Sequence, residues 1–462
     1  MKRVAIDNYS RRLKVGFALR AGSMEFWRIS GLACLASAAL LVWTAPAMAQ
    51  AGQLDPTFGT AGLFITQDTQ SFDARADAVA VQSDGRIVVG GEISSLAGVL
   101  RLNTNGTLDS SFGSGGMVTI NVPSDLGGGV QVVGVAIQSD GKIVAGISTI
   151  NSDGEQSFLL ARLTAAGSLD STLGSGGIVE TLPFGLQLSP TVLALQPDGR
   201  ILLAGDGVMA RYNTGGQLDQ SFGSAGLALL INGRLTAIAL QPNGQILVAS
   251  GGPARDAFPP SFDTLSVAGL ISRYNANGSL DTTFGASGQA ASVPTASAIV
   301  VQSDGRIVVA GSLTSKLIPP PAGDDTGFGL VRYNSNGTLD ATFGKRGLVV
   351  TDFGPTGPIA EPFALAVQPN GAIIAAGVAG PAQRAFGATP SSFALARYNS
   401  LGQRDTSFGA GGKVTTGFGS NTASICALAL QSDGKIVAAG NSGTLVMQSF
   451  VNNIAVARYL AQ

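Results

Sequence analysis

Histidine is absent from the 462 residues, cysteine occurs twice, and only 12% of the residues are charged. Without histidine the chain lacks the commonest general base and a common metal ligand, so any catalysis would depend on other side chains. The two cysteines, Cys34 and Cys426, are too few for a disulfide-rich scaffold. Glycine, in contrast, occurs 64 times, which is typical of many short strands joined by tight turns.

The composition of residues 1–49 predicts a signal peptide. Seven Lys and Arg residues are followed by an apolar run from Ile29 to Trp43 and then by the small residues of AMA. The run is shorter than the roughly 20 residues that span a membrane. We expect cleavage after Ala49, with Met24 as a possible true start, and an exported protein in the periplasm or outside the cell with no membrane span after cleavage.

The predicted mature chain, residues 50–462, is mildly acidic. The first 49 residues hold seven of the 28 basic and two of the 29 acidic residues, which leaves 21 basic and 27 acidic residues and a net charge of −6. An acidic chain without a basic cluster is not expected to bind nucleic acid. Its lone Cys426 cannot form an internal disulfide, and its setting in ASICALAL indicates a small apolar residue rather than a nucleophile.

Three short elements recur seven times each, which predicts a repeat fold with a period of about 59 residues. The first is a Q-[SP]-[DN]-G turn, the second resembles LDxxFGxxG, and the third is an arginine in an apolar run. The glutamines are Gln82, Gln138, Gln196, Gln241, Gln302, Gln368 and Gln431. The aspartates are Asp55, Asp109, Asp170, Asp219, Asp281, Asp340 and Asp405, and the arginines are Arg101, Arg162, Arg211, Arg273, Arg332, Arg397 and Arg458.

Each period contains four strand-like runs rich in Val, Ile and Leu, for example GGMVTINV, VGVAIQ, KIVAGI and FLLARL. The DG or NG between the second and third runs indicates a hairpin, because glycine accepts a positive φ. Because the runs are almost continuously apolar, both faces of each sheet must be covered. Four-stranded antiparallel sheets packed face to face around an axis meet this need, so the sequence predicts an all-β, seven-bladed β-propeller as a single domain over residues 50–462.

The two ends of the predicted domain complete each other. The chain stops shortly after Arg458, where six earlier units continue into the aspartate loop, and the mature chain begins with AGQLDPTFGTAGLFITQ. We therefore expect the strand near Leu63 to Gln67 to join the C-terminal blade beside Val456 to Leu460. Closure of the ring would leave no free sheet edge, and we expect a monomer.

The repeated stretches LNTNGTLDSSFGSGG and AVAVQSDGRIVVGG resemble the delta-60 repeat family of bacterial exported proteins over nearly the whole mature chain. The hairpin ALAVQPDGRILLAG is also similar to the inner hairpin of NHL-type propellers. The second resemblance implies that the AVAVQ strand is innermost, followed by RIVVGG, the arginine strand and then GLFIT of the next period. Neither resemblance implies an activity or supplies catalytic residues.

The predicted innermost strands offer little chemistry. Small residues stand two and four positions before the glutamines, which suits strands that converge on a crowded axis, and large residues alternate with them to fill the wedge between blades. No polar side chain occurs in the four residues before any of the seven glutamines, and Asp77 is the only acid five positions before one. Catalysis is therefore uncertain and disfavoured, although carboxylate or Ca²⁺ chemistry stays open.

The repeated motif residues have a simple structural interpretation. Each aspartate can accept backbone N–H bonds within its loop or pair with the repeated arginine. The phenylalanine of FG is expected in the blade core. An EF-hand is excluded, because aligning Gly337 with its invariant glycine puts Arg332 and Phe343 at acidic ligand positions. No cofactor is expected; a surface Ca²⁺ turn at Asn151 to Glu155 is a lesser alternative.

Three long connections follow the second strand in consecutive blades: Gly251 to Gly269, Ser312 to Gly327 and Val378 to Ser392. Alternate connections of an up-and-down sheet share one face, so these loops should project together. Their candidate binding residues are Arg255, Asp256, Phe258, Phe262, Lys316, Asp324, Asp325, Arg384 and Phe386. The favoured function is a non-catalytic module that binds a protein or glycan. The alternatives are a structural or adhesion scaffold, and a carboxylate- or metal-dependent enzyme of the lyase or lactonase type.

Overall fold

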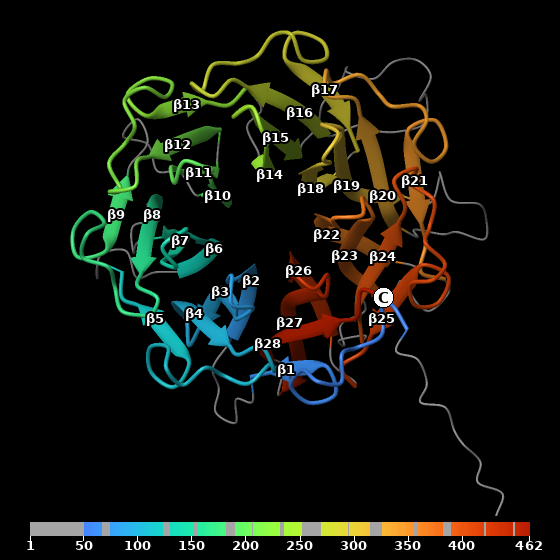
Figure 1. Ribbon diagram of the computed structural model, residues 1–462, viewed down its shortest axis with the longest axis horizontal. Helices are drawn as coiled ribbons and strands as arrows, with labels where there is room; N and C mark the ends of the chain where they lie inside the picture. The colour runs from blue at the N-terminus through green and yellow to red at the C-terminus, as the bar shows by residue number, and fades with distance from the viewer. Residues whose placement is uncertain are drawn as a thin grey trace, which may run out of the picture. The chain divides into compact units, whose positions relative to one another are not determined.

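The described residues form a ring of seven four-stranded antiparallel sheets (Figure 1). The structure is a computed structural model. It describes residues 50–66, 74–122, 130–150, 156–181, 190–205, 207–231, 235–251, 269–293, 295–314, 326–354, 359–381, 390–419, 422–446 and 449–462. All regular secondary structure in these ranges is β-strand. The predicted all-β, seven-bladed propeller is confirmed.

Each blade takes four strands, numbered here in chain order. Blade 1 has β2 (Ala74–Val81), β3 (Ile87–Ile93), β4 (Leu96–Leu102) and β5 (Met117–Ile120); blade 2 has β6 (Val130–Ile137), β7 (Ile143–Ile150), β8 (Gln156–Leu163) and β9 (Ile178–Thr181). Blade 3 has β10 (Val192–Leu195), β11 (Ile201–Gly205), β12 (Val208–Tyr212) and β13 (Leu227–Leu229); blade 4 has β14 (Leu235–Leu240), β15 (Ile246–Gly251), β16 (Gly269–Tyr274) and β17 (Gln289–Ser292).

Blade 5 has β18 (Thr295–Val301), β19 (Ile307–Thr314), β20 (Thr326–Tyr333) and β21 (Leu348–Thr351); blade 6 has β22 (Ile359–Val367), β23 (Ile373–Gly380), β24 (Ser392–Tyr398) and β25 (Lys413–Thr416). Blade 7 has β26 (Thr422–Leu430), β27 (Ile436–Val446), β28 (Ser449–Tyr459) and β1 (Leu63–Ile65). The first strand of every blade lies innermost, around the centre of the ring, and the fourth lies at the periphery (Figure 1). This is the predicted strand order.

The repeated Q-[SP]-[DN]-G turn joins the first and second strands of each blade. In blade 1, Gln82 N–H donates to the carbonyl of Arg86, Gly85 N–H donates to that of Gln82, and Asp84 Oδ1 accepts from Arg86 N–H. Gly85 has a φ of 84°, which L side chains adopt at a cost, so glycine is required here. The predicted hairpin is therefore confirmed, and the turn sets the register that begins with Val81 opposite Ile87.

Side chains of the strands fill the seams between neighbouring blades. The first four residues of every second strand are apolar, and all five residues of β11 are buried, for example. The expectation for the innermost strands is only partly right. In blade 3 the large Leu193 and Leu195 pack toward blade 2, and the smaller Val192 and Ala194 pack toward blade 4. Both sets therefore pack in seams, because the faces of a radial sheet point to the neighbouring blades.

The ring is closed by the N-terminal strand. β1 pairs antiparallel with β28, with Leu63 opposite Ala457 and Ile65 opposite Ala455, and β28 continues into β27 and β26. An isolated bridge adds Leu54 opposite Tyr459. The predicted closure is confirmed, although the pairing includes Ala455, and Gln67 lies outside the described residues. Blade 7 therefore combines strands from both chain ends.

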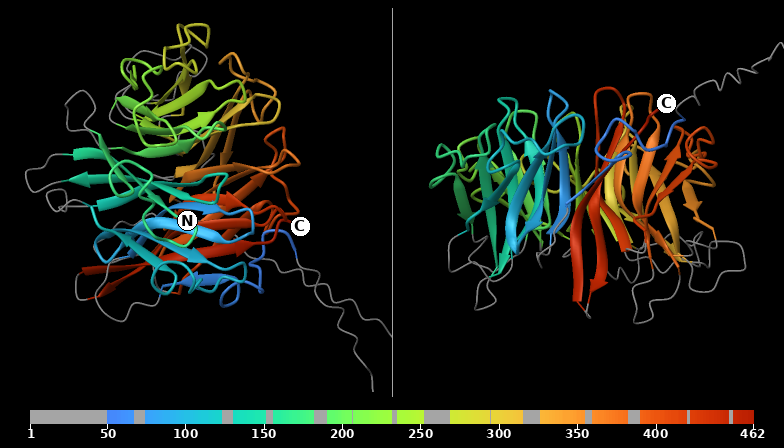
Figure 2. Two further views of the ribbon diagram at one scale, coloured as in Figure 1. Left: turned by 60° about the vertical axis from the view of Figure 1, so that its left-hand side comes forward. Right: turned by 90° about the horizontal axis from the view of Figure 1, so that it is seen from below.

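Each disc face carries one kind of connection. The turn face carries the Q-[SP]-[DN]-G turns and the loops that lead from the third strand to the fourth. The loop face carries the links from second to third strands and from each fourth strand to the next blade. Because neighbouring strands are antiparallel, Gly251, Thr314 and Gly380 end β15, β19 and β23 at the loop face. Figure 2 shows the disc edge-on, with opposite strand ends at its two faces.

Candidate functional site

Seven ion pairs repeat around the turn face, one in each blade; five aspartates are buried, and Asp219 of blade 3 and Asp405 of blade 6 are partly exposed. The Nε of the repeated arginine lies 2.7 to 2.9 Å from Oδ2 of the repeated aspartate. In six blades the guanidinium also lies over a phenylalanine ring, with Cζ 4.4 to 4.8 Å from the centroid. Blade 2 has Leu173 in place of that ring. We call the arginine, aspartate and ring position the clip.

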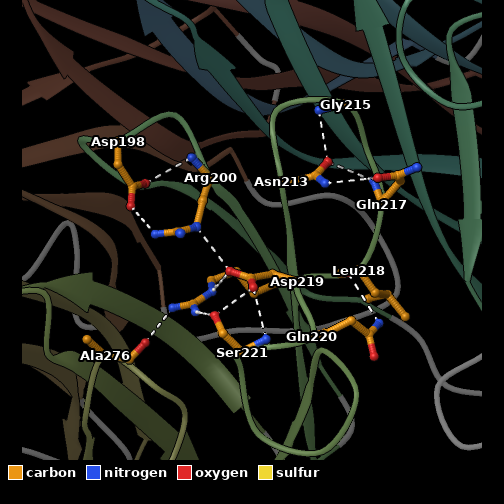
Figure 3. A network of polar contacts seen from close by, with 11 residues as sticks. Asp198, Arg200, Asn213, Gly215, Gln217, Leu218, Asp219, Gln220, Ser221 and Ala276 are labelled. Atoms are coloured by element: carbon orange, nitrogen blue, oxygen red, sulfur yellow. Dashed lines mark hydrogen bonds and ion pairs between the residues drawn. The ribbon is translucent and has the colours of Figure 1, made fainter.

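The clip aspartate also shapes its own loop. In blade 3, Asp219 Oδ1 accepts bonds from the N–H and the hydroxyl of Ser221 at 3.0 and 2.7 Å (Figure 3). Its Oδ2 is 3.0 Å from Nε of Arg200, a second cation that also pairs with Asp198. Figure 3 shows this carboxylate at the centre of the network. The sequence suggested that each aspartate caps its own loop or pairs with the repeated arginine. The structure shows that it does both.

Each clip also joins its blade to the next. Arg101 Nη1 donates to the carbonyl of Ala165, and the N–H of Gly113 donates to the adjoining carbonyl of Ala166. The same two bonds occur at every seam. Between blades 6 and 7 the two carbonyls belong to Ala461 and Ala51, so the two chain ends together form one turn.

The clip lowers the pKa of its carboxylates. Burial alone would raise the pKa of Asp55, but hydrogen bonds from Thr57 and the charges of Arg458 and Lys435 lower it from 3.8 to about 2. The pKa of each of the other six clip aspartates is also lowered, by a neighbouring hydroxyl, a backbone N–H and the paired arginine. Carboxylates held in the ionised form are poor general acids near neutral pH, because a general acid needs an available proton.

The loop-face candidates lie outside the described residues. These are Arg255, Asp256, Phe258, Phe262, Lys316, Asp324, Asp325, Arg384 and Phe386, together with the possible calcium turn at Asn151 to Glu155. What the structure does place is the strand ends that hold them. β15 and β16 pair from Gly251 opposite Gly269, and β19 and β20 pair from Thr314 opposite Thr326. Paired ends anchor both sides of a connection on the rigid ring.

The innermost strands carry a ring of irregular positions five places before the repeated glutamine. In six blades the pairing with the second strand skips this residue, which is a β-bulge. The residues at this position are Asp77, Val133, Thr191, Thr236, Ser297, Phe363 and Cys426, and none is fully buried. A bulge changes the direction of a side chain and is frequent beside functional sites. The innermost strands therefore carry variable side chains at this one position of an otherwise regular repeat.

Two of these positions, Asp77 and Cys426, belong to a polar cluster across blades 7, 1 and 2. Arg75 Nε lies 3.0 Å from Asp77 Oδ1, and the side chain of Gln131 hydrogen-bonds Asp77. Asn441 Oδ1 accepts from the N–H of Ala76 at 2.8 Å. We call Arg75, Asp77, Glu92, Gln131, Cys426 and Asn441 the channel cluster; Glu92 lies opposite Arg75 on β3, and Asn441 Nδ2 lies 3.5 Å from Cys426 Sγ.

Burial and charge act in different directions within the channel cluster. Burial raises the pKa of Asp77, and the charge of Arg75 opposes this rise only in part. Burial lowers the pKa of Arg75, but its pKa is raised overall because Asp77 stabilises the cation. Burial, with the charge of Asp77 beside it, raises the pKa of the Cys426 thiol to about 12. Cys426 is therefore protonated near neutral pH and is a poor nucleophile.

The sequence interpretation found only part of this cluster. It singled out Asp77 but missed Arg75 and Gln131, which stand seven positions before their glutamines. The bulge inserts one residue between these positions and the rest of the strand, so simple alternation fails beyond it. The usable signal was that polar residues recur at this position in several repeats, with Glu361 and Ser424 in blades 6 and 7.

A surface groove of about 570 Å³ lies on the turn face between blades 3 and 4. Its polar lining includes Gln196, Gln241 and three charged residues that are already paired: Arg211 and Arg200 with the clip residue Asp219, and Asp198 with Arg200. The two glutamine Oε1 atoms are buried without a partner, but so are those of three other repeated glutamines outside this groove. The groove is therefore a product of the repeat, and nothing singles it out as a binding site.

Two further observations limit the chemistry of the described ranges. Among these residues, no three acidic or cysteine side chains are gathered closely enough to hold a metal ion. A helix of the length and apolar character needed to cross a membrane is likewise missing from the ranges that the structure describes.

The fold and its repeated clips define a β-propeller repeat protein. Consistent with this class, six stretches match the family model described as "Domain of unknown function (DUF5122) beta-propeller". The matched stretches are residues 82–112, 138–173, 196–222, 266–284, 302–343 and 368–408. They cover less than half of the chain and are similar to a β-propeller repeat family. No curated protein matches the sequence.

Several solved structures are similar to the chain at low sequence identity. An ulvan lyase of polysaccharide lyase family PL25 is 11% identical, with 86% of this chain and 96% of that chain covered and a TM-score of 0.45. The PQQ-bound aldose sugar dehydrogenase from Streptomyces coelicolor is 12% identical, with 68% of this chain and 91% of that chain covered and a TM-score of 0.40. The extracellular domain of a putative hybrid two component system from B. thetaiotaomicron is 12% identical, with 86% of this chain and 41% of that chain covered and a TM-score of 0.40. This chain therefore spans less than half of that one. Likeness at this level concerns the fold alone.

Proposed function

We propose that this protein is an exported, non-catalytic propeller that binds a protein or a glycan on its loop face. The observation that carries the proposal is the contrast between the two faces. On the turn face, seven nearly identical clips use their charges to hold the ring together. On the loop face, connections of very different length leave the paired ends of β15, β19 and β23. A rigid scaffold with variable loops on one face is a common arrangement for recognition.

Export and the family type belong to the same proposal. The basic start, the apolar run and Ala49 support removal of residues 1–49 and a periplasmic or extracellular location. The repeats LNTNGTLDSSFGSGG and AVAVQSDGRIVVGG support a delta-60 repeat protein. The mature ring would act as a monomer, with no nucleic-acid partner and no resident cofactor.

Affinity capture from an envelope extract tests the proposal. The bait is residues 50–462, and the comparison is the same ring with residues 253–268 and 315–325 replaced by short Gly-Ser links. A second control removes one turn-face charge by Asp304→Asn. We expect a saturable partner that the intact ring and Asp304→Asn retain and the trimmed ring loses. Equal capture by a folded trimmed ring would refute the role of the loops and favour a scaffold.

An enzyme is the second candidate, and Asp77 is the observation that favours it. A partly buried carboxyl with a raised pKa and a specific charge partner is a candidate for a functional site. Arg75 pairs with this carboxyl, and Asp77 is the only acid among the seven residues that stand five positions before the repeated glutamines. A screen of lyase and lactonase substrates, with Asp77→Asn as the comparison, would detect this activity if the wild type turns over and the variant does not.

A further inference from the structure

One corner of the turn face, where blades 5 and 6 meet, departs from the repeat at four positions. The two residues between the glycines of the FGxxG motif are uncharged in six units and are Lys345 and Arg346 in blade 5. The residue before the clip aspartate is leucine in six units and Arg404 in blade 6. The residue four positions before that aspartate is Asn, Ala or Gly in six units and Leu401 in blade 6. We call these four residues the corner patch.

The corner patch lies on two loops that are in direct contact. The N–H of Gly344 donates to the carbonyl of Leu401 at 2.8 Å. A Cβ added at Gly402 would lie 2.8 Å from the ring of Phe343, so the two loops pack closely. Every member of the patch stands within three positions of Gly344 or Leu401 along the chain, so the four residues gather at a single seam.

All four patch residues are exposed, and Leu401 is 50% exposed. Among the described residues, none of the three cations forms an ion pair; Arg404 Nη1 donates to the carbonyl of Gly411 at 3.2 Å. The acids of the turn-face loops in these two blades are each already paired with an arginine: Asp304 with Arg306, Asp340 with Arg332 and Asp405 with Arg397. The corner therefore carries three uncompensated positive charges, although the predicted mature chain is acidic overall.

The combination of charge and apolar exposure favours an anionic lipid surface over other anions. A phosphate ion or an acidic glycan would use the cations but leave Leu401 in water. A protein interface of standard size covers about 800 Å² on each partner, and the only other exposed large apolar residue on the described turn face is Leu169, in blade 2. A lipid headgroup layer attracts basic side chains and lets a single apolar side chain reach the boundary with the acyl chains.

We propose that the corner patch docks the ring on an anionic lipid surface, with the turn face toward the lipid. The side chain of Leu401 enters the headgroup layer, and the three cations contact the lipid phosphates. The acidic remainder of the ring is repelled by the same surface, which favours this one orientation. The inference goes beyond the proposed function and does not depend on it, because the loop face stays accessible to a partner on the opposite side of the disc.

Flotation of residues 50–462 with lipid vesicles tests the proposal. One set of vesicles is phosphatidylcholine alone, and the other is phosphatidylcholine and phosphatidylglycerol in equal parts. The patch variants change each of the three cations to glutamine in turn, or Leu401 to alanine. The matched controls are Arg86→Gln, which removes the same charge from the turn face of blade 1, and Leu169→Ala, which removes an exposed leucine. Thermal unfolding of each variant checks that the ring is intact.

We expect binding to the anionic vesicles only, weakened about fivefold in each patch variant, unchanged in both controls and lost in about 0.5 M salt. The ring with trimmed loops should float like the wild type, which separates this site from the loop-face function. Equal binding to both kinds of vesicle, equal weakening by Arg86→Gln, or no flotation with anionic vesicles would overturn the proposal. Binding of soluble oligogalacturonate through the cations alone, with the vesicles left unbound, would overturn it in favour of an acidic glycan.

Discussion

Replacing Asp55 by Asn is expected to weaken the closure of the ring more than any surface change. Asp55 and Arg458 stand 403 residues apart in the chain, and their Oδ2 and Nε atoms lie 2.9 Å apart. The two side chains are 3% and 5% exposed, so the Asn variant leaves a buried guanidinium without its carboxylate. Loss of one partner of a buried pair costs about 3 kcal/mol or more.

The pKa of Asp55 gives an independent magnitude. Its fall from 3.8 to about 2 corresponds to about 2 kcal/mol of stability from this carboxylate. Because the folded-state pKa is the lower one, this stability is present above about pH 4 and is lost as the pH falls toward about 2. The difference between wild type and Asp55→Asn should therefore shrink as the solution is acidified.

Urea unfolding of residues 50–462 at neutral pH and at several acidic pH values measures both effects. Asp304→Asn is the control, because Asp304 is an exposed turn-face acid with a side-chain exposure of 51%; its cost should stay within about 0.5 kcal/mol. An unfolding midpoint of Asp55→Asn equal to that of wild type would refute the assigned role of the closure pair. So would a difference between the two proteins that does not change with pH.

Three smaller predictions concern other parts of the ring. Gly106→Ala should destabilise the protein clearly more than Gly354→Ala in the same urea assay. Both glycines have a φ near 82°, but an added Cβ at Gly106 would lie 2.6 Å from the nitrogen of Gly59, whereas nothing lies within 4 Å at Gly354. Phe112→Leu, which copies the natural leucine of blade 2, should cost about 1 kcal/mol through loss of the ring under its arginine; an unchanged midpoint would contradict this. Cys426 should react with iodoacetamide far more slowly in the folded protein than in urea near neutral pH, because its pKa is raised to about 12; equal rates would show that burial does not protect the thiol.

Most of the fold could be predicted because the same turn, strand and loop motifs occur in every repeat. The glutamine turn, the apolar strands and the aspartate loop each occur seven times, so a misreading in one unit is corrected by the others. Ring closure could also be predicted, because AGQLD near the start of residues 50–462 supplies the motif that is missing after Arg458. The structure adds that Ala461 and Ala51 together complete the last turn of the ring.

The channel cluster could not be predicted in the same way. Its members Asp77 and Gln131 belong to different blades, and their contact depends on the angle between neighbouring sheets rather than on chain spacing. The bulge at Asp77 also breaks the alternation on which strand interpretation rests. Repetition helps least where the repeats differ, and function-specific residues are expected at such positions.

Hydrogen–deuterium exchange of the ring, alone and with its captured partner, tests the central claim most directly. If the partner docks on the loop face, exchange should slow at the loop-face ends of β19, β20 and β23, near Thr314, Thr326 and Gly380. Exchange at the turn-face hairpins, such as Gln82 to Arg86, should be unchanged. Protection confined to the turn-face hairpins, or spread equally over both faces, would contradict the account.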